Sequence, residues 1–155
     1  MNLKLVIGLL TVLVLTACSE APPCPDFKAS PVVTSAGCVA YQGQSLLLVQ
    51  GQNDAVSVPG GSANQGESGR CAAFRETWEE TGLVVEPKQL IRTFDNGFHL
   101  YHCNVAQWPE TFSPPFRLEI KQVLLLDRAD FDQHSWRFPD QQQWLSEWLQ
   151  GVVKE

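Results

Sequence analysis

Short apolar runs separated by turn signals occupy the middle of the chain. Residues 38–41 and 45–50 are two such runs, and Gln42, Gly43 and Gln44 between them predict a β-hairpin. Residues 46–49 are apolar at every position rather than at every second one. A strand with that pattern is usually buried on both faces, so we expect it at the centre of a sheet.

A second hairpin and a further strand follow. Residues 90–94 and 98–105 have the pattern of strands around Asp95-Asn96-Gly97, a strong hairpin turn. Residues 106–118 contain several prolines, and we expect irregular structure there. Residues 120–126 end in an apolar run over residues 123–126, which predicts another buried strand.

Two helices complete the expected fold. Residues 69–81 contain no proline and are followed by Gly82, a residue type that commonly ends helices. A terminal helix begins at Pro139 or Asp140 and ends at Gly151. Its apolar positions are Trp144, Leu145, Trp148 and Leu149. Strands with one central and one terminal helix predict an α/β (α+β) sandwich in which helices flank a mixed β-sheet.

Composition narrows the class of protein. The chain has 155 residues, of which 44% are hydrophobic and 18% charged, values that fit one globular domain. Its formal net charge is −6. Because binding to a nucleic-acid backbone usually requires basic patches, we expect no nucleic acid as the main partner, and a small-molecule partner is compatible with this charge.

The N-terminus carries a targeting pattern. Lys4 precedes an apolar run over residues 5–15, which is shorter than the roughly 20 residues that span a bilayer. The run ends in Leu15-Thr16-Ala17-Cys18, which resembles the lipobox of bacterial lipoproteins. The resemblance implies a signal peptide over residues 1–17 and a lipidated Cys18. The alternative is an ordinary secretory signal with a chance cysteine.

The lipobox resemblance also implies a location. Lipid chains on Cys18 would anchor the protein to a membrane. Ser19 after the cysteine is similar to the outer-membrane sorting choice, so we expect the periplasmic face of the bacterial cell envelope. Residues 18–34, rich in proline and small polar residues, are expected to form a tether, and residues 35–155 the folded domain.

The remaining cysteines suggest an oxidising compartment. The chain has five cysteines, and setting Cys18 aside leaves an even number. In an exported protein this indicates two disulfides, with the connectivity open. The alternative is buried free thiols, and a zinc site has little support because no CxxC pair occurs. The candidates are Cys24, Cys38, Cys71 and Cys103.

The chemistry concentrates in residues 61–83, GSANQGESGRCAAFRETWEETGL. On a helix, Glu76, Glu79 and Glu80 fall on one arc of the surface. These carboxylates repel one another unless cations neutralise them. The alternative is a solvated acidic face. The fixed positions of the pattern are Gly61, Glu67, Arg75, Glu76, Glu79, Glu80 and Gly82.

These spacings resemble the Nudix box, the signature of the Nudix hydrolase family. All of its fixed identities are present, and a chance match is on the order of one in 10⁸ to 10⁹. The resemblance implies a Nudix-like α/β/α sandwich and an enzyme that acts on phosphoanhydride bonds. It further implies a metal cofactor, Mg²⁺ or Mn²⁺, which prefers carboxylate and carbonyl oxygens.

The resemblance assigns roles within the box. Metal ligands are expected from Glu76, Glu79 and Glu80, with Glu79 and Glu80 the most direct. The backbone carbonyl of Gly60 would complete the set. The remaining box residues divide between carboxylate orientation, for Arg75 and Glu67, and structure, for Gly61 and Gly82.

Other residues lie outside this scheme or depart from it. Some Nudix enzymes take a general base from a later loop, and Glu110 and Glu119 are the candidates; each can equally be a surface carboxylate. Thr77 replaces the usual aliphatic residue, and we expect its hydroxyl to bond the carbonyl of Ala73. Val56 stands where many relatives have Trp.

The expected function is metal-dependent hydrolysis of the diphosphate linkage in a nucleoside diphosphate linked to another moiety. Nucleotide sugars, dinucleotides, NTPs and related diphosphates all fit. The alternative is a non-catalytic Nudix-fold lipoprotein that senses a ligand or binds a partner. A purely structural lipoprotein is a third hypothesis, which the complete motif disfavours.

Overall fold

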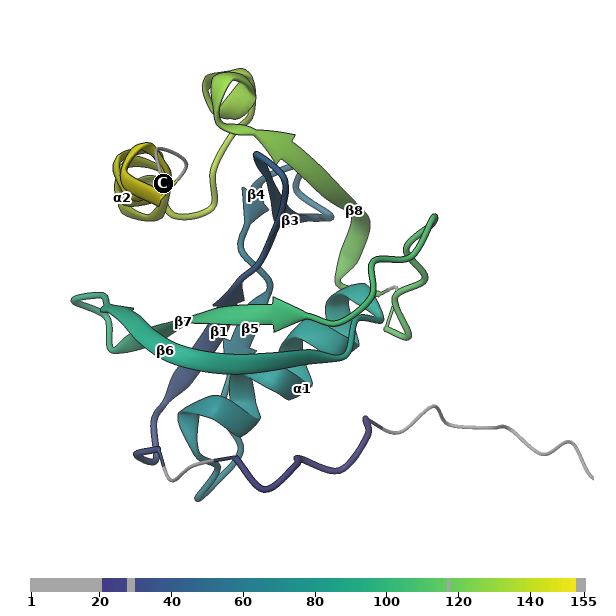
Figure 1. The fold of residues 1–155 in the computed structure, drawn as a ribbon, viewed down its shortest axis with the longest axis vertical. Helices are drawn as coiled ribbons and strands as arrows, with labels where there is room; N and C mark the ends of the chain where they lie inside the picture. The colour runs from purple at the N-terminus through teal and green to yellow at the C-terminus, as the bar shows by residue number, and fades with distance from the viewer. Residues whose placement is uncertain (1–20, 28–29, 117, 153–155) are drawn as a thin grey trace, which may run out of the picture.

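The computed structural model describes residues 21–27, 30–116 and 118–152 (Figure 1). The expected signal peptide and Cys18 lie outside the described residues. Within the described part of the chain, no helix has the length and hydropathy needed to cross a bilayer.

One sheet has the strand order β5-β1-β7-β6. It contains β1 (Ser35–Val39), β5 (Gly60–Ser62), β6 (Val85–Thr93) and β7 (Phe98–Val105). The β1–β7 pair is parallel, whereas β1–β5 and β6–β7 are antiparallel, so the sheet is mixed. The expected hairpin around residues 95–97 is confirmed as the β6–β7 connection.

The second sheet is built on β3 (Ser45–Gly51), which pairs antiparallel with its three partners. These are β2 (Tyr41–Gln42), β4 (Val56–Ser57) and β8 (Ile120–Asp127). The β2–β3 hairpin turns at Gly43, which has φ 63°, as its sequence predicts. All pairs of this sheet are antiparallel.

Helices cover both sides of these sheets. Helix α1 (Gly69–Thr81) packs on β1, β5, β6 and β7 and reaches β8. Helix α2 (Pro139–Val152) follows the short 3₁₀ helix η1 (Arg128–Gln133) and lies on the other side (Figure 1). The mixed-sheet sandwich with flanking helices confirms the expected fold class.

The strand expected at the centre is buried on both faces. Leu47 packs into the core under α1 with Phe74, whereas Leu46 and Leu48 pack into the core under α2 with Leu145. All three leucines of β3 are fully buried. Each contributes about 1.5–3 kcal/mol by its removal from water. The alternation of β3 therefore joins the two helical layers.

Two disulfides fasten the structure, as expected for this chain. Cys38 on β1 is bonded to Cys103 on β7, with a Cα–Cα distance of 5.6 Å. Cys24 is bonded to Cys71 in the first turn of α1, with a Cα–Cα distance of 5.5 Å. The second bond ties the segment that precedes the domain to the helix that carries the acidic residues.

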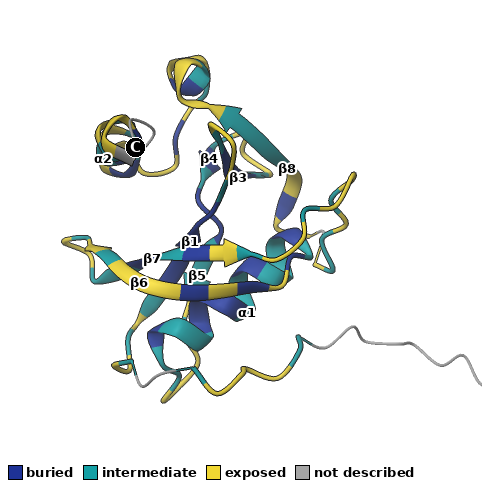
Figure 2. Cartoon of the chain, viewed as in Figure 1, coloured by how far each residue is buried: buried dark blue, intermediate teal, exposed yellow. Residues whose placement is uncertain are grey.

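Three local expectations differ from the structure (Figure 2). Residues 60–62, where the sequence pattern predicted no strand, form β5 because they pair with β1. Strand β8 is mostly half-buried or exposed, with Ile120 its one fully buried residue, because β3 is its only strand partner among the described residues. Helix α2 continues through Gly151 to Val152.

Candidate active site

Helix α1 presents the acidic residues between two well-defined ends. The side chain of Ser68 accepts a hydrogen bond from the Cys71 amide at 3.4 Å, which caps the N-terminus. Gly82 ends the helix at φ 77°, and its N–H donates to the Trp78 carbonyl at 2.7 Å. A Cβ at this glycine would stand 2.7 Å from the carbonyl oxygen of Ser113, so both space and conformation require glycine.

The opposite face of α1 is packed against the sheet. Thr77 is fully buried, and its hydroxyl donates to the Ala73 carbonyl at 2.7 Å, as its sequence position predicts. The bond satisfies the only polar atom of that side chain while its methyl group packs in the core. The departure from an aliphatic residue therefore leaves the acidic face unchanged.

Arg75 organises the carboxylates of the box. Its Nε and Nη2 atoms donate to the two oxygens of Glu67 at 3.0 and 2.9 Å, a bidentate pair. Its Nη1 donates to Glu76 at 2.9 Å and to Glu79 at 3.0 Å. A further bond from Nη2 reaches the Ser62 carbonyl at 2.8 Å. One guanidinium thus contacts three of the four box carboxylates.

The pairing of Arg75 with Glu67 shifts the pKa values of both side chains. Burial alone raises the pKa of Glu67, but hydrogen bonds from Arg75 and from the Asn64 amide outweigh it and leave that pKa below its ordinary value. The hydrogen bond to Glu67 raises the pKa of Arg75. Glu67 is therefore a fully ionised partner that fixes the guanidinium.

The Gly60–Gly61 backbone lies against two of the box carboxylates, Glu80 and Glu76. The Gly60 amide donates to Oε2 of Glu80 at 2.8 Å. A Cβ at Gly61 would lie 2.5 Å from Oε2 of Glu76, so glycine is what allows that carboxylate to approach the backbone. Glu76 and Glu80 therefore meet the Gly60–Gly61 backbone, whereas Glu79 is turned toward Arg75.

Glu80 carries the strongest electrostatic perturbation of the site. Burial raises its pKa to about 8, and the negative charges of Glu76 and Glu119 add to the effect. The Gly60 amide and the positive charge of Arg137 act in the opposite direction. Burial also raises the pKa of Glu76, against the opposing effect of Arg75. The site therefore holds more negative charge than its own side chains neutralise.

The structure distinguishes the two downstream candidates. The charge of Glu119, in the turn just before β8, acts on both Glu76 and Glu80. Glu110 is exposed in the loop over residues 106–119 and forms no hydrogen bond or ion pair with another described residue. Of the two, Glu119 is the residue that the fold brings to the acidic cluster.

These residues fit a divalent cation by their chemistry. They supply carboxylate oxygens beside a backbone loop, which is the donor type that Mg²⁺ and Mn²⁺ prefer. The raised pKa values of Glu76 and Glu80 reflect buried charge that a cation would neutralise. In the described part of the chain, three such side chains do not converge on one point. In this structure the carboxylates instead accept hydrogen bonds from Arg75 and from the Gly60 amide.

A pocket adjoins the same loop. Its volume is about 260 Å³, and its walls include Phe94, Phe98, Phe138 and the buried Gln141. The tip of the Phe98 ring reaches Gly60, since a Cβ at that glycine would stand 3.0 Å from the ring's Cζ. The pocket wall and the acidic cluster thus each have a residue next to Gly60, Phe98 and Glu80 respectively.

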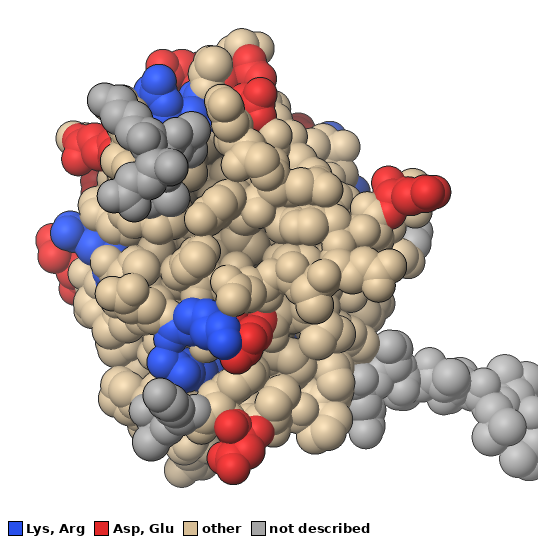
Figure 3. Space-filling model, viewed as in Figure 1, with Lys and Arg blue, Asp and Glu red and all other residues tan. Residues whose placement is uncertain are grey.

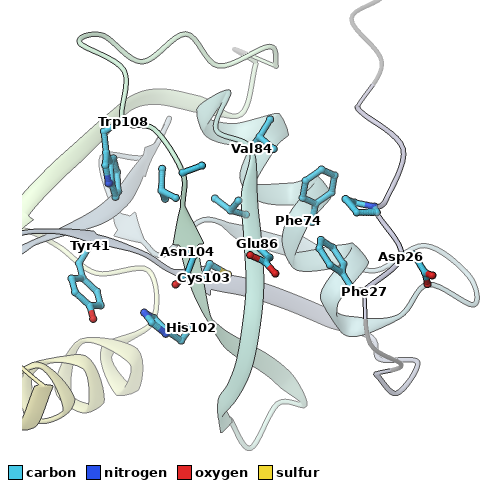
Figure 4. A pocket seen from close by; sticks show the side chains of 14 residues that line it. Asp26, Phe27, Tyr41, Phe74, Val84, Glu86, His102, Cys103, Asn104 and Trp108 are labelled. Atoms are coloured by element: carbon cyan, nitrogen blue, oxygen red, sulfur yellow. The ribbon is translucent and has the colours of Figure 1, made fainter.

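A larger cavity, of about 760 Å³, lies elsewhere (Figure 4). Figure 4 shows Tyr41 and His102 at one end of it and Phe27 and Phe74 at the other. No carboxylate of the box lines this cavity. The larger volume of this cavity is therefore no reason to place the candidate chemistry there.

Charges on the visible surface are mixed. On the face drawn in Figure 3, acidic and basic side chains are interspersed over a mostly uncharged surface. Among the residues described there, basic side chains form no broad continuous patch.

Sequence reasoning did not identify several residues near the site. These are Arg137, Gln141, Phe94 and Phe98, which no sequence pattern placed there. Arg137 reaches this region because its segment pairs with Val56, a contact between distant parts of the chain. Its position next to an aromatic residue before a helix-starting proline was the only local signal.

Comparison with known proteins agrees with this architecture. The family model described as NUDIX domain matches residues 31–149. A NUDIX hydrolase from Nitrosomonas europaea has 20% identity, with 78% of this chain and 90% of that chain covered and a TM-score of 0.66. An ADP-ribose pyrophosphatase from Streptococcus suis has 20% identity, coverages of 73% and 88%, and a TM-score of 0.62.

An Ap4A hydrolase from C. elegans is also similar, with 16% identity, coverages of 78% and 99%, and a TM-score of 0.59. At these identities the solved structures establish the fold. The family model spans most of the chain, and the chain belongs to the Nudix family. This membership confirms the prediction of a Nudix-type pyrophosphohydrolase at the level of the family.

Proposed function

We propose that this Nudix-family chain hydrolyses the diphosphate linkage of a nucleoside diphosphate joined to another group, with Mg²⁺ or Mn²⁺ as cofactor. The observation that carries the proposal is the excess of buried negative charge at Glu76 and Glu80, beside the Gly60–Gly61 backbone. Such a site favours divalent cations and, through them, an anionic diphosphate.

The cation would be held by Glu76, Glu80 and the Gly60 carbonyl. Glu79 would become a further ligand by giving up its hydrogen bond from Arg75. When bound, the cation supplies charge neutralisation at the phosphate oxygens and lowers the pKa of water. Arg75 keeps the carboxylates in place, because it is itself fixed by its bidentate pair with Glu67.

Glu119 is the proposed general base. It lies in the turn just before β8, and its charge acts on two carboxylates of the cluster. A carboxylate at this position can accept a proton from the water that attacks phosphorus. Glu110, which forms no hydrogen bond or ion pair with another described residue, is the weaker candidate.

The adjoining pocket would receive the organic group attached to the diphosphate. Phe94, Phe98 and Phe138 offer ring faces, and stacking on a base contributes about 1–3 kcal/mol. The side-chain oxygen Oε1 of Gln141 accepts a hydrogen bond from the Val58 amide at 3.2 Å. The side-chain NH₂ group of Gln141 is left to donate to a ligand. The names of the similar ADP-ribose pyrophosphatase and Ap4A hydrolase support a nucleotide substrate.

We also propose export and lipid anchoring. The Cys24–Cys71 and Cys38–Cys103 disulfides support an oxidising compartment such as the periplasm. The lipobox pattern before Cys18 supports attachment to the outer membrane. Replacement of Cys18 by Ala should abolish lipid labelling and membrane retention, and retention without label would contradict the anchor.

The test of hydrolysis uses the purified, disulfide-bonded protein with Mg²⁺ or Mn²⁺. Its substrates are nucleotide sugars, dinucleotides, nucleoside triphosphates and isoprenoid diphosphates. Glu76→Gln and Glu80→Gln are the site variants. Glu86→Gln is the matched control, because Glu86 is exposed on β6 and pairs with Lys88.

We expect the wild type and Glu86→Gln to hydrolyse at least one substrate at equal rates, and the site variants to lose most of that activity. Equal activity in all variants would refute the assignment of the site. Tight binding of a diphosphate compound without hydrolysis would instead support the alternative, a ligand-sensing or partner-binding module.

A further inference from the structure

Arg137 lines the pocket, and backbone pairing fixes its place in the fold. Its segment pairs with β4: the Val56 amide donates to the Ser135 carbonyl at 2.8 Å, and the Arg137 amide donates to the Val56 carbonyl at 2.9 Å. A bridge between Val56 and Trp136 belongs to the same pairing. Pairing with β4 therefore fixes the position of the Arg137 backbone.

The stretch from Val56 to Gly60 makes three contacts at alternate residues. Val56 bonds Arg137, Val58 bonds Gln141, and Gly60 bonds Glu80. Extended chain advances about 3.3 Å per residue, so the first and last of these residues are at most about 14 Å apart. The long side chain of arginine can bridge part of this distance.

Arg137 lies beside the residues that connect the pocket to the cluster. It lines the pocket together with Phe98, whose ring tip reaches Gly60. The Gly60 amide in turn donates to Glu80 at 2.8 Å. Arg137 thus shares a pocket wall with a residue that contacts the backbone to which Glu80 is bonded.

Among the described residues, Arg137 forms no ion pair, although Asp95 and Asp140 line the same pocket. Its guanidinium lies 5.3 Å from the centre of the Phe138 ring. A ring face orients a guanidinium and leaves its N–H groups free at the edge. Those donors match the oxygens of a phosphate, which arginine binds in bidentate fashion.

We infer that Arg137 binds the phosphate of the substrate that is attached to the group in the pocket. This inference rests on the proposed function, because it assumes a diphosphate that runs from the pocket to the acidic cluster. It also specifies the substrate: an aromatic base linked through its sugar to the phosphate that Arg137 contacts. Arg137 is then a determinant of substrate binding rather than of bond cleavage.

The experiment separates the phosphate from the base. Binding of AMP, GMP, UMP and CMP, and of the four matching nucleosides, is measured by calorimetry on the full disulfide-bonded protein. The variants are Arg137→Gln, Arg137→Lys and the control Arg128→Gln. Arg128 follows one end of β8 and Glu119 precedes the other, and the strand between them is about 23 Å long.

We expect Arg137→Gln to weaken the best-bound nucleoside monophosphate about 10-fold or more. The matching nucleoside should change by less than about twofold, because it lacks the phosphate. Arg137→Lys should recover part of the loss through its charge. Arg128→Gln should behave as the wild type. With a hydrolysed substrate, Arg137→Gln should raise KM more than it lowers kcat.

Four results would overturn the inference: unchanged monophosphate binding in Arg137→Gln, an equal loss for monophosphate and nucleoside, the same loss in Arg128→Gln, or no monophosphate binding to the wild type. Each can occur whether or not the enzyme hydrolyses a diphosphate. Conversely, phosphate-dependent weakening in a protein without hydrolysis would uphold the role of Arg137 and refute the proposed reaction.

Discussion

Replacement of Glu80 by Gln should change how the stability of the protein depends on pH. Burial and neighbouring carboxylates raise the pKa of Glu80 to about 8 from an ordinary value of 4.5. Between these values the folded protein holds a proton that the unfolded chain has lost. The unfolded state binds fewer protons, so the free energy of unfolding falls as pH rises through this window.

The magnitude follows from the two pKa values. At 1.36 kcal/mol for each pKa unit, Glu80 destabilises the metal-free protein by at most about 5 kcal/mol at pH 9 relative to pH 4. Gln at this position is neutral throughout and can still accept from the Gly60 amide. The raised pKa of Glu76 has the same sign and leaves a smaller slope in the variant.

The assay is urea unfolding in EDTA at several pH values from 5 to 8.5. We expect the variant to gain on the wild type steadily over this range, by a few kcal/mol. Added Mg²⁺ should stabilise the wild type most at the alkaline end and the variant much less. Glu86→Gln serves as the control and should follow the wild type. A wild-type-to-variant difference that does not change with pH would refute the reasoning.

Three further substitutions test other contacts. Gly61→Ala places a Cβ 2.5 Å from the Glu76 carboxylate, and displacement of that flexible group should lower kcat about 100-fold with little loss of stability. Replacement of Cys38 and Cys103 by Ala opens a link with a sequence separation of 65 and should lower the unfolding free energy by about 4 kcal/mol. Thr77→Val removes one buried hydroxyl and should change stability by less than about 1 kcal/mol with activity intact.

Steady-state kinetics and urea unfolding measure all three. Wild-type kcat in Gly61→Ala would contradict the close approach of Glu76 to the loop. A loss below about 1 kcal/mol in the double cysteine variant would mean that the β1–β7 pair does not need its covalent link. Thr77→Val would contradict the prediction if it lost activity, because the hydroxyl faces away from the carboxylates.

Local signals predicted the centre of the fold. Gly82 marked the end of α1, since only the left-handed conformation and an open Cα position suit that site. The continuous apolar run in β3 predicted a strand covered on both faces, and the turn at Gly97 predicted the β6–β7 hairpin. In each case the residues that determine the structure are neighbours in the sequence.

Contacts between distant residues could not be predicted in the same way. The pairing of Val56 with Trp136 depends on the path of the chain after η1, so the sequence around Arg137 did not predict its position near the site. Cys24–Cys71 was one of several possible connectivities. No local sequence pattern distinguished Glu119 from Glu110, and only the fold brings one of them to the cluster.

The alternation of contacts between Val56 and Gly60 has a consequence for how relatives of this protein can diverge. A one-residue insertion or deletion within this stretch would reverse which side each later residue faces. Gly60 would then turn away from Glu80, and the distance between Arg137 and the acidic cluster would change. The loop at residues 52–55 carries no such constraint and can change length. Substrate preference can therefore change through the pocket's side chains, while the spacing between pocket and acidic cluster stays constant.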